Sequence, residues 1–219
     1  KLIKNGHTAI LEHGTIYLKI PSKTTSIYLV KKYYFNQYSV SRSDKYNIYI
    51  TTNYRVLVEN NWLEDLKYAC EVIEHHEKRI SFKITCSRAI ANELVRHRKF
   101  SFAQESTRYC NYSKDKFSNN LTFIKPSWYN KAEETNTLLE ERATFLSIYS
   151  LDEEIYLKLV SEHKMKPQLA RDILPLALKT EIIMTGYKCD WDNFFKLRDA
   201  NSAAHPDMQI IAEAIKSQI

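Results

Sequence analysis

Two segments of the chain alternate between hydrophobic and polar positions. Every second side chain is apolar in residues 16–20, and the same period of two runs through residues 80–86 (ISFKITC). This period is typical of a strand with one buried face. We therefore predict a strand in each segment. A short apolar run over residues 121–124 is a third candidate strand, which Pro126 is expected to end.

Other segments repeat their apolar residues at the spacing of an α-helix. In residues 61–76 the apolar positions follow i, i+4, i+7 and i+8, which predicts an amphipathic helix. Ser87 is a suitable N-cap for a second helix, which carries Ile90, Leu94 and His97 on one side.

The C-terminal half is predicted to be mainly helical, with Pro167 in the first turn of one helix and a kink at Pro175. Residues 22–43 are polar and tyrosine-rich, and we interpret them either as a hairpin or as an excursion of the chain away from the regular elements. The expected C-terminal helices cover residues 131–163 (two segments parted near 150–152), 167–187, 191–199 and 206–217. This order predicts an α+β fold in a single domain over residues 1–219, with a small mixed sheet packed with several helices and a helix-rich C-terminal half.

The composition excludes some ways of binding a nucleotide. Only 3 of the 219 residues are glycine, so the glycine-rich loops of dinucleotide-binding folds and P-loops are absent. The net charge of +6 favours an anionic partner, either nucleic acid or small phosphates. A nucleic-acid-binding module is the weaker hypothesis, because no run of Lys and Arg exceeds two residues.

The sequence contains no apolar run of ~20 residues that would span a membrane. No signal-peptide pattern opens it either. Its four cysteines are scattered, which favours free thiols over a metal site. We therefore expect a cytoplasmic protein with no membrane partner, no nucleic-acid partner and no metal.

The densest group of polar residues lies between residues 96 and 113. Arg96, His97 and Arg98 are consecutive, and the segment that follows them is rich in hydroxyl, amide and charged side chains. Three cationic residues also suit the C-terminus of a helix, whose dipole they complement. Arginines and hydroxyls can bind a phosphate without a glycine loop. The residues alone leave both interpretations open.

This segment resembles the signature of the flavin-dependent thymidylate synthases (the ThyX family). Arg96-His97-Arg98 is followed by seven residues and Ser106, and then by Arg108-Tyr109. Three further segments resemble elements of that family, namely residues 7–13 (HTAILEH), 171–175 (RDILP) and 193–198 (NFFKLR).

The resemblance implies an enzyme that methylates dUMP to dTMP. The one-carbon donor is then 5,10-methylenetetrahydrofolate, and FAD reduced by NADPH donates the hydride. Arg198 matches the arginine that stabilises the N3-ionised uracil, and it is the implied catalytic residue. The resemblance also implies a homotetramer in which subunits share the active sites.

The resemblance assigns site residues one by one. The implied dUMP contacts are Glu93, Arg96, Gln104, Ser106, Arg108, Arg171 and Arg198. The implied FAD contacts are His13, Thr15, Arg96, His97, Arg98, Gln104, Tyr187 and Asn193.

The sequence departs from the family pattern in several places. About sixty residues separate His13 from the strand at Ile80, so we interpret residues 22–78 as a family-atypical insertion. If the family pattern is aligned backwards from Arg96 without an insertion, its flavin-side element falls on residues 75–77 and not on His13. Residues 75–77 are therefore the alternative flavin-side element. Glu93 stands where glutamine is common, and we expect it to orient an arginine.

Two other positions also differ from the family, and they leave open a protein that kept the fold and lost catalysis. Tyr187 replaces a usual asparagine and either stacks on a ligand or fills space, while His205 replaces a usual glutamine. Cys110 is the nucleophile of a runner-up mechanism, although we expect it to be a packing residue because no Pro-Cys-His context surrounds it.

Overall fold

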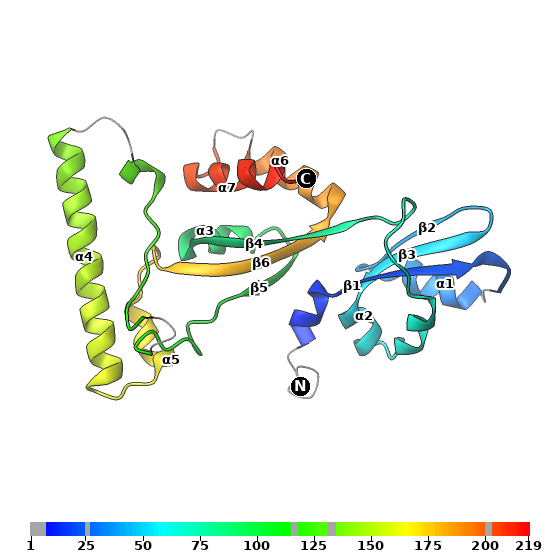
Figure 1. The fold of residues 1–219 in the computed structure, drawn as a ribbon, viewed down its shortest axis with the longest axis horizontal. Coiled ribbons are helices and arrows are strands. Elements are labelled where there is room, and N and C mark those ends of the chain that lie inside the picture. The colour runs from blue at the N-terminus through cyan, green and yellow to red at the C-terminus, as the bar shows by residue number, and fades with distance from the viewer. Residues whose placement is uncertain (1–7, 25–26, 115–117, 131–134, 200–202) are drawn as a thin grey trace. The chain divides into compact units, whose positions relative to one another are not determined.

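The computed structural model describes residues 8–24, 27–114, 118–130, 135–199 and 203–219 (Figure 1). His7 and residues 131–134, which belong to predicted elements, lie outside these ranges. The chain forms two compact units, each built from separate stretches. The first unit contains Lys1–Phe82, Arg98–Ala103 and Ile183–Phe194, and the second contains Lys83–His97, Gln104–Ile182 and Phe195–Ile219.

The first unit contains a three-stranded antiparallel sheet, whose strands have the order β1-β3-β2. Its first strand confirms the one predicted over residues 16–20. Asp44 shapes the turn between the other two strands, because its side chain accepts hydrogen bonds from the backbone N–H groups of Tyr46 and Asn47, both at 2.7 Å. The strands are β1 (Thr15–Pro21), β2 (Val40–Ser43) and β3 (Asn47–Asn53).

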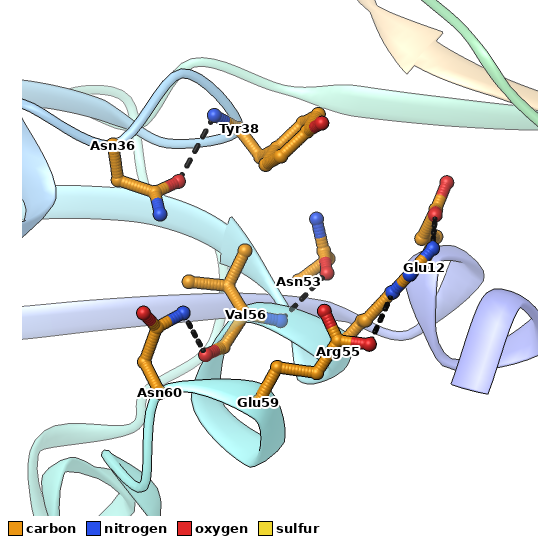
Figure 2. A pocket seen from close by; sticks show the side chains of 8 residues that line it. All are labelled: Glu12, Asn36, Tyr38, Asn53, Arg55, Val56, Glu59 and Asn60. Atoms are coloured by element: carbon orange, nitrogen blue, oxygen red, sulfur yellow. Dashed lines mark hydrogen bonds and ion pairs between the residues drawn. The ribbon is translucent and has the colours of Figure 1, made fainter. Parts of the chain in front are cut away.

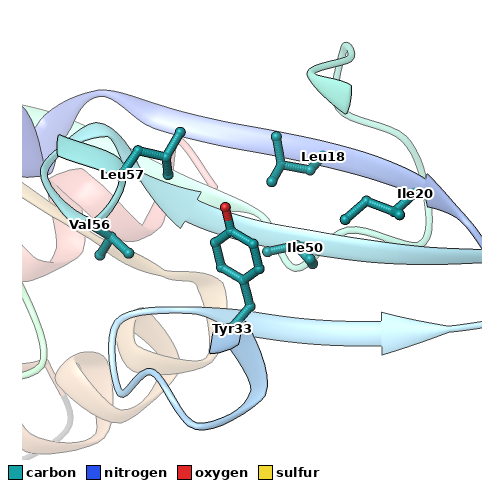
Figure 3. Packing of buried hydrophobic residues seen from close by; sticks show 6 residues of the cluster. All are labelled: Leu18, Ile20, Tyr33, Ile50, Val56 and Leu57. Carbon is teal, nitrogen blue, oxygen red and sulfur yellow. The ribbon is translucent and has the colours of Figure 1, made fainter. Parts of the chain in front are cut away.

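Short helices surround this sheet and close a hydrophobic core over it. Figure 3 shows the core side chains of the strands and helices directed toward one another. The helices are the 3₁₀ helices η2 (Thr8–His13), η3 (Ser22–Thr24) and η4 (Leu63–Tyr68), and the α-helices α1 (Ile27–Tyr34) and α2 (Tyr54–Glu59). The core cluster consists of Leu18, Ile20, Tyr33, Ile50, Val56 and Leu57.

A buried carboxylate holds α1 against η4. Asp65 is 1% exposed and accepts a hydrogen bond from the Tyr33 hydroxyl at 2.6 Å, and the ammonium group of Lys32 lies 2.5 Å from the same oxygen. Burial raises the pKa of the Tyr33 hydroxyl, and its hydrogen bond to Asp65 raises that pKa further. The charge of Asp65 is thus compensated inside the unit.

The amphipathic helix predicted over residues 61–76 is wrong. The α-helix α2 ends before this segment, at a turn where Asn61 has a φ of 59°, and only η4 follows. Beyond η4, Ala69 is extended and forms a bridge to Leu18. The backbone N–H of Cys70 then donates to the carbonyl of Tyr17 at 3.0 Å. The sheet edge satisfies this backbone, so tertiary pairing overrides the helical spacing.

Residues 22–43 are only partly the predicted hairpin. They include the helix α1, and β2 at their end pairs with β3.

A second sheet has the strand order β4-β6-β5. Its strands are β4 (Arg79–Ser87), β5 (Ser101–Gln104) and β6 (Lys179–Tyr187). The N–H of Lys188 donates to the carbonyl of Lys78, and the N–H of Arg88 donates to that of Leu178, so β4 and β6 run antiparallel. The strand predicted over residues 80–86 is confirmed, while the predicted single mixed sheet is replaced by two separate sheets.

The helix predicted from Pro167 to residue 187 is also wrong. Pro167 does open a helix, α5 (Pro167–Ala170), but this is one turn followed by the 3₁₀ helix η7 (Arg171–Ile173). The chain then enters β6, in which Thr180, Ile182 and Met184 are buried with a period of two. The β-branched residues of this segment and Pro175 before it favour a strand.

The remaining helices agree more closely with the sequence. Ser87 caps α3 (Arg88–Leu94) as predicted, because its hydroxyl accepts a hydrogen bond from the N–H of Ile90 at 3.3 Å. The segment predicted as two helices is one continuous helix over its described part, α4 (Asn136–Ser161), since residues 150–152 include no glycine or proline. The others are η6 (Ser127–Asn130), α6 (Lys188–Arg198) and α7 (Pro206–Lys216), the last two as predicted.

The strand predicted over residues 121–124 is reduced to a single bridge between Phe123 and Leu178. The α+β class is confirmed, because both sheets and helices are abundant. In the part of the chain that the structure describes, no helix is long and apolar enough to cross a membrane.

Gly186 on β6 lies against an aromatic cluster of the first unit. A Cβ atom at this position would overlap the ring of Phe100, which packs edge-on against Trp191 with ring centroids 4.7 Å apart. Trp191 is fully buried, and its indole N–H donates to the carbonyl of Ile80 at 3.3 Å. The cluster therefore has no room for a larger residue at position 186.

We expect Gly186→Ala to lower the free energy of unfolding by about 1–3 kcal/mol, because the added methyl group overpacks the cluster. Urea unfolding at equilibrium measures this change. The double variant Gly186→Ala/Phe100→Leu should recover part of the loss relative to Phe100→Leu alone. Purely additive effects of the two substitutions would show that the Phe100 ring is not the obstacle.

Candidate active site

The two units divide the predicted site residues. Those predicted to contact dUMP all belong to the second unit, and they are Glu93, Arg96, Gln104, Ser106, Arg108, Arg171 and Arg198. Those predicted to contact FAD are divided, with His13, Thr15, Arg98, Tyr187 and Asn193 in the first unit. Each group is described within its own unit.

Arg198, the last residue of α6, lies in a three-residue cluster of the second unit. Its Nη1 donates to Oε2 of Glu93 at 2.9 Å, and its Nε donates to Nε2 of His97 at 2.9 Å. The cluster forms because α3 ends at Leu94, whose carbonyl accepts a hydrogen bond from the N–H of His97. The arginine that Glu93 was expected to orient is thus Arg198.

The hydrogen bond from Arg198 fixes the protonation state of His97. Because Nε2 accepts a hydrogen bond, the imidazole is neutral and carries its proton on Nδ1. Burial lowers the pKa of His97, and the charge of Arg198 lowers it further, while Glu93 opposes both effects. In the described chain, Nη2 of Arg198 makes no hydrogen bond, so this donor remains for a ligand.

Arg96 and Arg98 lie beyond the end of α3 and not on it, which corrects the helical placement that the sequence suggested. The helix ends at Leu94 with Val95 as its C-cap, and both arginines are exposed. Neither has a carboxylate within 4.0 Å among the residues that the structure describes. Both retain an uncompensated charge near a helix C-terminus.

Ser106 begins a tight turn that presents Arg108. The hydroxyl of Ser106 accepts a hydrogen bond from the N–H of Arg108 at 3.3 Å, and its carbonyl accepts one from the N–H of Cys110 at 3.0 Å. The exposed guanidinium group of Arg108 lies 5.4 Å from the ring centroid of Tyr109. Gln104, at the end of β5, donates to the hydroxyl of Thr180 at 3.4 Å. The turn therefore combines a hydroxyl and a cation on two nearby positions.

Two predicted ligand-binding residues, Arg171 and Asn193, are accessible on their helices. Arg171 is half-buried where α5 meets η7, and in the described chain no carboxylate lies within 4.0 Å of it. Asn193 is exposed on α6. Both side chains are accessible to a ligand.

His13 and Thr15 flank the start of β1 in the first unit. Nδ1 of His13 is 2.8 Å from the hydroxyl of Thr185 on β6. Burial lowers the pKa of His13. The hydroxyl of Thr15 accepts a hydrogen bond from Nη1 of Arg79 at 3.3 Å.

Arg79 was missed by the sequence analysis. It occupies the first position of β4, where a lone arginine is indistinguishable from a solvated strand end. In the structure it donates to the carbonyl of Glu12 at 2.9 Å and to the hydroxyl of Ser101 at 3.3 Å. Its guanidinium carbon lies 5.6 Å from the ring centroid of Tyr187.

Tyr187 has partners inside the first unit. Its hydroxyl lies 3.1 Å from the backbone carbonyls of both Tyr38 and Thr51, which share its single proton. Burial raises the pKa of this hydroxyl. These contacts suit the space-filling role, and Arg79 covers the ring on which a ligand was expected to stack.

The alternative flavin-side residues have different surroundings. Nδ1 of His76 accepts a hydrogen bond from the N–H of Ile73 at 3.2 Å, and its Nε2 is 3.1 Å from the carbonyl of Leu18. His76 is thus a buried histidine with both nitrogens occupied. Glu77 pairs with Arg42, and exposed His75 stacks on Tyr49 with ring centroids 4.7 Å apart.

A polar cavity of about 270 Å³ lies beside α2 in the first unit, and Figure 2 shows the side chains that line it. Arg55 lies along it and pairs with both Glu12 and Glu59. The arginine is therefore fully compensated, and three asparagines complete the polar lining. Across the described ranges, no group of three or more His, Cys, Asp or Glu side chains is arranged to hold a metal ion.

The cluster around Arg198 predicts a pH-dependent stability. The folded state holds His97 with a pKa below its unfolded value of about 6.5, so the unfolded state binds the proton first as the pH falls. Stability should therefore decrease as the pH falls through about 6.5 toward the lower folded pKa. Urea unfolding as a function of pH measures this slope.

His97→Gln should reduce the slope, since glutamine accepts the Arg198 hydrogen bond without titrating. Part of the slope should remain, because the pKa of His13 is lowered in the same direction. Equal slopes for the wild type and His97→Gln would contradict the proposed protonation state.

The comparisons with known proteins agree on one family. Residues 61–219 match the family model Thy1, described as "Thymidylate synthase complementing protein". A flavin-dependent thymidylate synthase of Mycobacterium tuberculosis is 32% identical over 156 residues, covering 66% of this chain and 57% of that protein. A probable flavin-dependent thymidylate synthase of Paramecium bursaria Chlorella virus 1 is 29% identical over 127 residues, covering 56% of this chain and 57% of that protein.

The chain thus matches just over half the length of these curated relatives. Among solved structures, thymidylate synthase X from Helicobacter pylori with FAD and dUMP aligns with a TM-score of 0.48 and 24% identity. That alignment covers 64% of this chain and 67% of the other. Because the family model matches well over half of the sequence, the chain belongs to the Thy1 family of thymidylate synthase complementing proteins.

Proposed function

We propose that this chain is a flavin-dependent thymidylate synthase that converts dUMP to dTMP. The one-carbon unit would come from 5,10-methylenetetrahydrofolate, and NADPH would reduce the FAD. The observation that carries the proposal is the location of every predicted dUMP residue within one compact unit, inside the stretch that matches the family. The relatives named as flavin-dependent thymidylate synthases support it.

The available cations fit two phosphorylated ligands. Arg96, Arg108 and Arg171 have no carboxylate within 4.0 Å in the described chain, whereas Arg42, Arg55 and Arg198 do. Arginines without a nearby carboxylate suit the phosphate of dUMP, because a guanidinium group can donate two hydrogen bonds to phosphate oxygens. Arg96 and Arg98 are candidate FAD contacts, as the resemblance implies.

Arg198 would act by electrostatic stabilisation. Carbon C5 of uracil becomes nucleophilic when the N3 proton is lost, and the resulting anion needs a nearby positive charge. An arginine stays protonated, because its pKa is above ~12, so it cannot be the base. Glu93 and His97 hold two of its nitrogens, which leaves Nη2 to interact with the ring. Bound FAD would supply the hydride.

The range of the family match bears on the flavin-side element. It begins at residue 61, so it contains His75 and Glu77 and excludes His13 and Thr15. We therefore prefer the alternative element to His13, and we propose that the atypical segment is shorter than residues 22–78 and ends before residue 61. We keep the single-domain interpretation of residues 1–219, because neither unit is one continuous stretch of chain.

We also propose a homotetramer with shared active sites. The helix α4 carries large apolar side chains that are about half exposed, which favours burial against another subunit. They are Leu139, Leu146, Ile148 and Leu151. Sedimentation analysis of the purified protein tests the assembly.

The proposed activity is tested on the purified protein. It should be yellow, lose its colour with NADPH, and release tritium from 5-tritiated dUMP when methylenetetrahydrofolate is present. A colourless protein that binds no added FAD and releases no tritium would overturn the proposal. FAD binding without tritium release would instead indicate a relative that has lost catalysis.

Arg198→Ala should lower kcat by about tenfold to a hundredfold or more, from the loss of a charged hydrogen bond worth ~1.5–3 kcal/mol. Steady-state kinetics with varied dUMP measures the effect. Lys83→Ala, which removes an exposed cation paired with Glu181 in the same unit, is the matched control and should retain kcat. Weaker dUMP binding with unchanged turnover in Arg198→Ala would count against the catalytic role.

Cys110→Ala should retain tritium release. The thiol of Cys110 lies 3.5 Å from Oε1 of Glu105, and a carboxylate next to a thiol disfavours the thiolate that a nucleophile requires. Loss of turnover in a folded Cys110→Ala protein, with FAD still bound, would restore the cysteine mechanism.

A further inference from the structure

Arg79 is a half-buried arginine whose hydrogen bonds all go to neutral acceptors. They are the carbonyl of Glu12 and the hydroxyls of Thr15 and Ser101, at 2.9–3.3 Å. Among the residues that the structure describes, no carboxylate lies within 4.0 Å of its guanidinium group. Burial lowers the pKa of Arg79, as expected for a cation withdrawn from water.

A guanidinium group removed from water normally has a counter-ion, because an unpaired buried charge is costly. The half-buried Arg55 of the same unit follows this rule, because it pairs with Glu12 and Glu59. Arg79 does not follow it, since Glu12 and Asp190 attract it only from beyond 4.0 Å. An external anion would therefore be its direct counter-ion.

Arg79 also lines a cavity of about 220 Å³ that lies entirely within the first unit. A second cation, Lys99, lines the same cavity and has no carboxylate within 4.0 Å in the described chain. Gln37, Asn53 and Ser101 add amide and hydroxyl groups. The volume lies just below the ~300 Å³ of the smallest ordinary ligand pockets, so it suits one charged part of a ligand.

Asp190 is the acidic residue that lines this cavity, and it opposes an anion. Burial raises its pKa, although Lys99 lowers it. The two cations outnumber this single carboxylate. The cavity therefore retains a net positive charge even when Asp190 is ionised.

We propose that this cavity is a phosphate-binding site in which Arg79 and Lys99 hold the anion. Resting on the proposed function, we assign the phosphate to the pyrophosphate of FAD. Tyr187 stands at a position that the resemblance assigns to FAD contact, and it lines this cavity with its ring covered by Arg79. Arginine and lysine together supply paired and single donors to phosphate oxygens.

The test is a calorimetric titration of the FAD-free protein with three probes: inorganic pyrophosphate, FAD, and riboflavin, which lacks phosphate. Arg79→Gln should lower the affinity for pyrophosphate and for FAD about 10- to 100-fold, as expected for a lost charged hydrogen bond. It should leave the affinity for riboflavin unchanged. Arg79→Lys should recover most of the affinity. Lys67→Gln, which removes an exposed cation on η4 of the same unit, should change the affinity for none of the three probes.

Lys99→Gln keeps the test valid if Arg79→Gln does not fold, because Lys99 is exposed. Lys99→Gln should lower the affinity for pyrophosphate and FAD and leave the affinity for riboflavin unchanged. Equal affinities of the wild type and both folded variants for pyrophosphate would overturn the site. If Arg79→Gln lowers the affinity for pyrophosphate but not the affinity for FAD, the assignment of the bound phosphate to FAD is overturned. Tritium release by the wild type is measured separately, so failure of the site leaves the proposed activity intact.

Discussion

The pairing of Arg198 with Glu93 and His97 is the constraint on which the proposed chemistry depends. It fixes a guanidinium group at the end of α6 against the segment that follows α3. One partner is a carboxylate that balances the positive charge, and the other is a neutral imidazole, so the cluster has no net charge while the guanidinium group stays protonated. The arginine is thus oriented and still presents the Nη2 donor of a protonated guanidinium group to an ionised uracil.

Much of the fold follows from local patterns. The period of two over residues 80–86 and the serine before α3 were sufficient to predict β4 and the N-cap, because both depend on near neighbours in the sequence. The helices predicted over 61–76 and 167–187 failed for one shared reason. Their backbones pair with distant strands, and helical spacing cannot reveal such partners.

The candidate site shows the same limit. The arginines of the 96–108 segment are visible as a motif, since their spacing is contiguous. Arg79 belongs to no sequence motif. It stands out only because the fold places neutral acceptors and, in the described part of the chain, no carboxylate within 4.0 Å beside its guanidinium group. Glu12 and Asp190, which are distant in sequence, attract Arg79 without forming an ion pair within 4.0 Å, so only the three-dimensional arrangement reveals that it lacks a direct counter-ion among the described residues.

The hydroxyl of Tyr187 joins the backbone of residues 38 and 51 to a strand encoded more than a hundred residues later. During synthesis the sheet β1-β3-β2 can form early, since its core lies within residues 18–57. The cavity around Arg79 must wait until residue 190 has left the ribosome. At ~5–20 residues per second, the half-buried arginine remains without its tyrosine for several seconds of translation. The first unit therefore begins to fold with the sheet β1-β3-β2 and is completed only after residue 190 has been made.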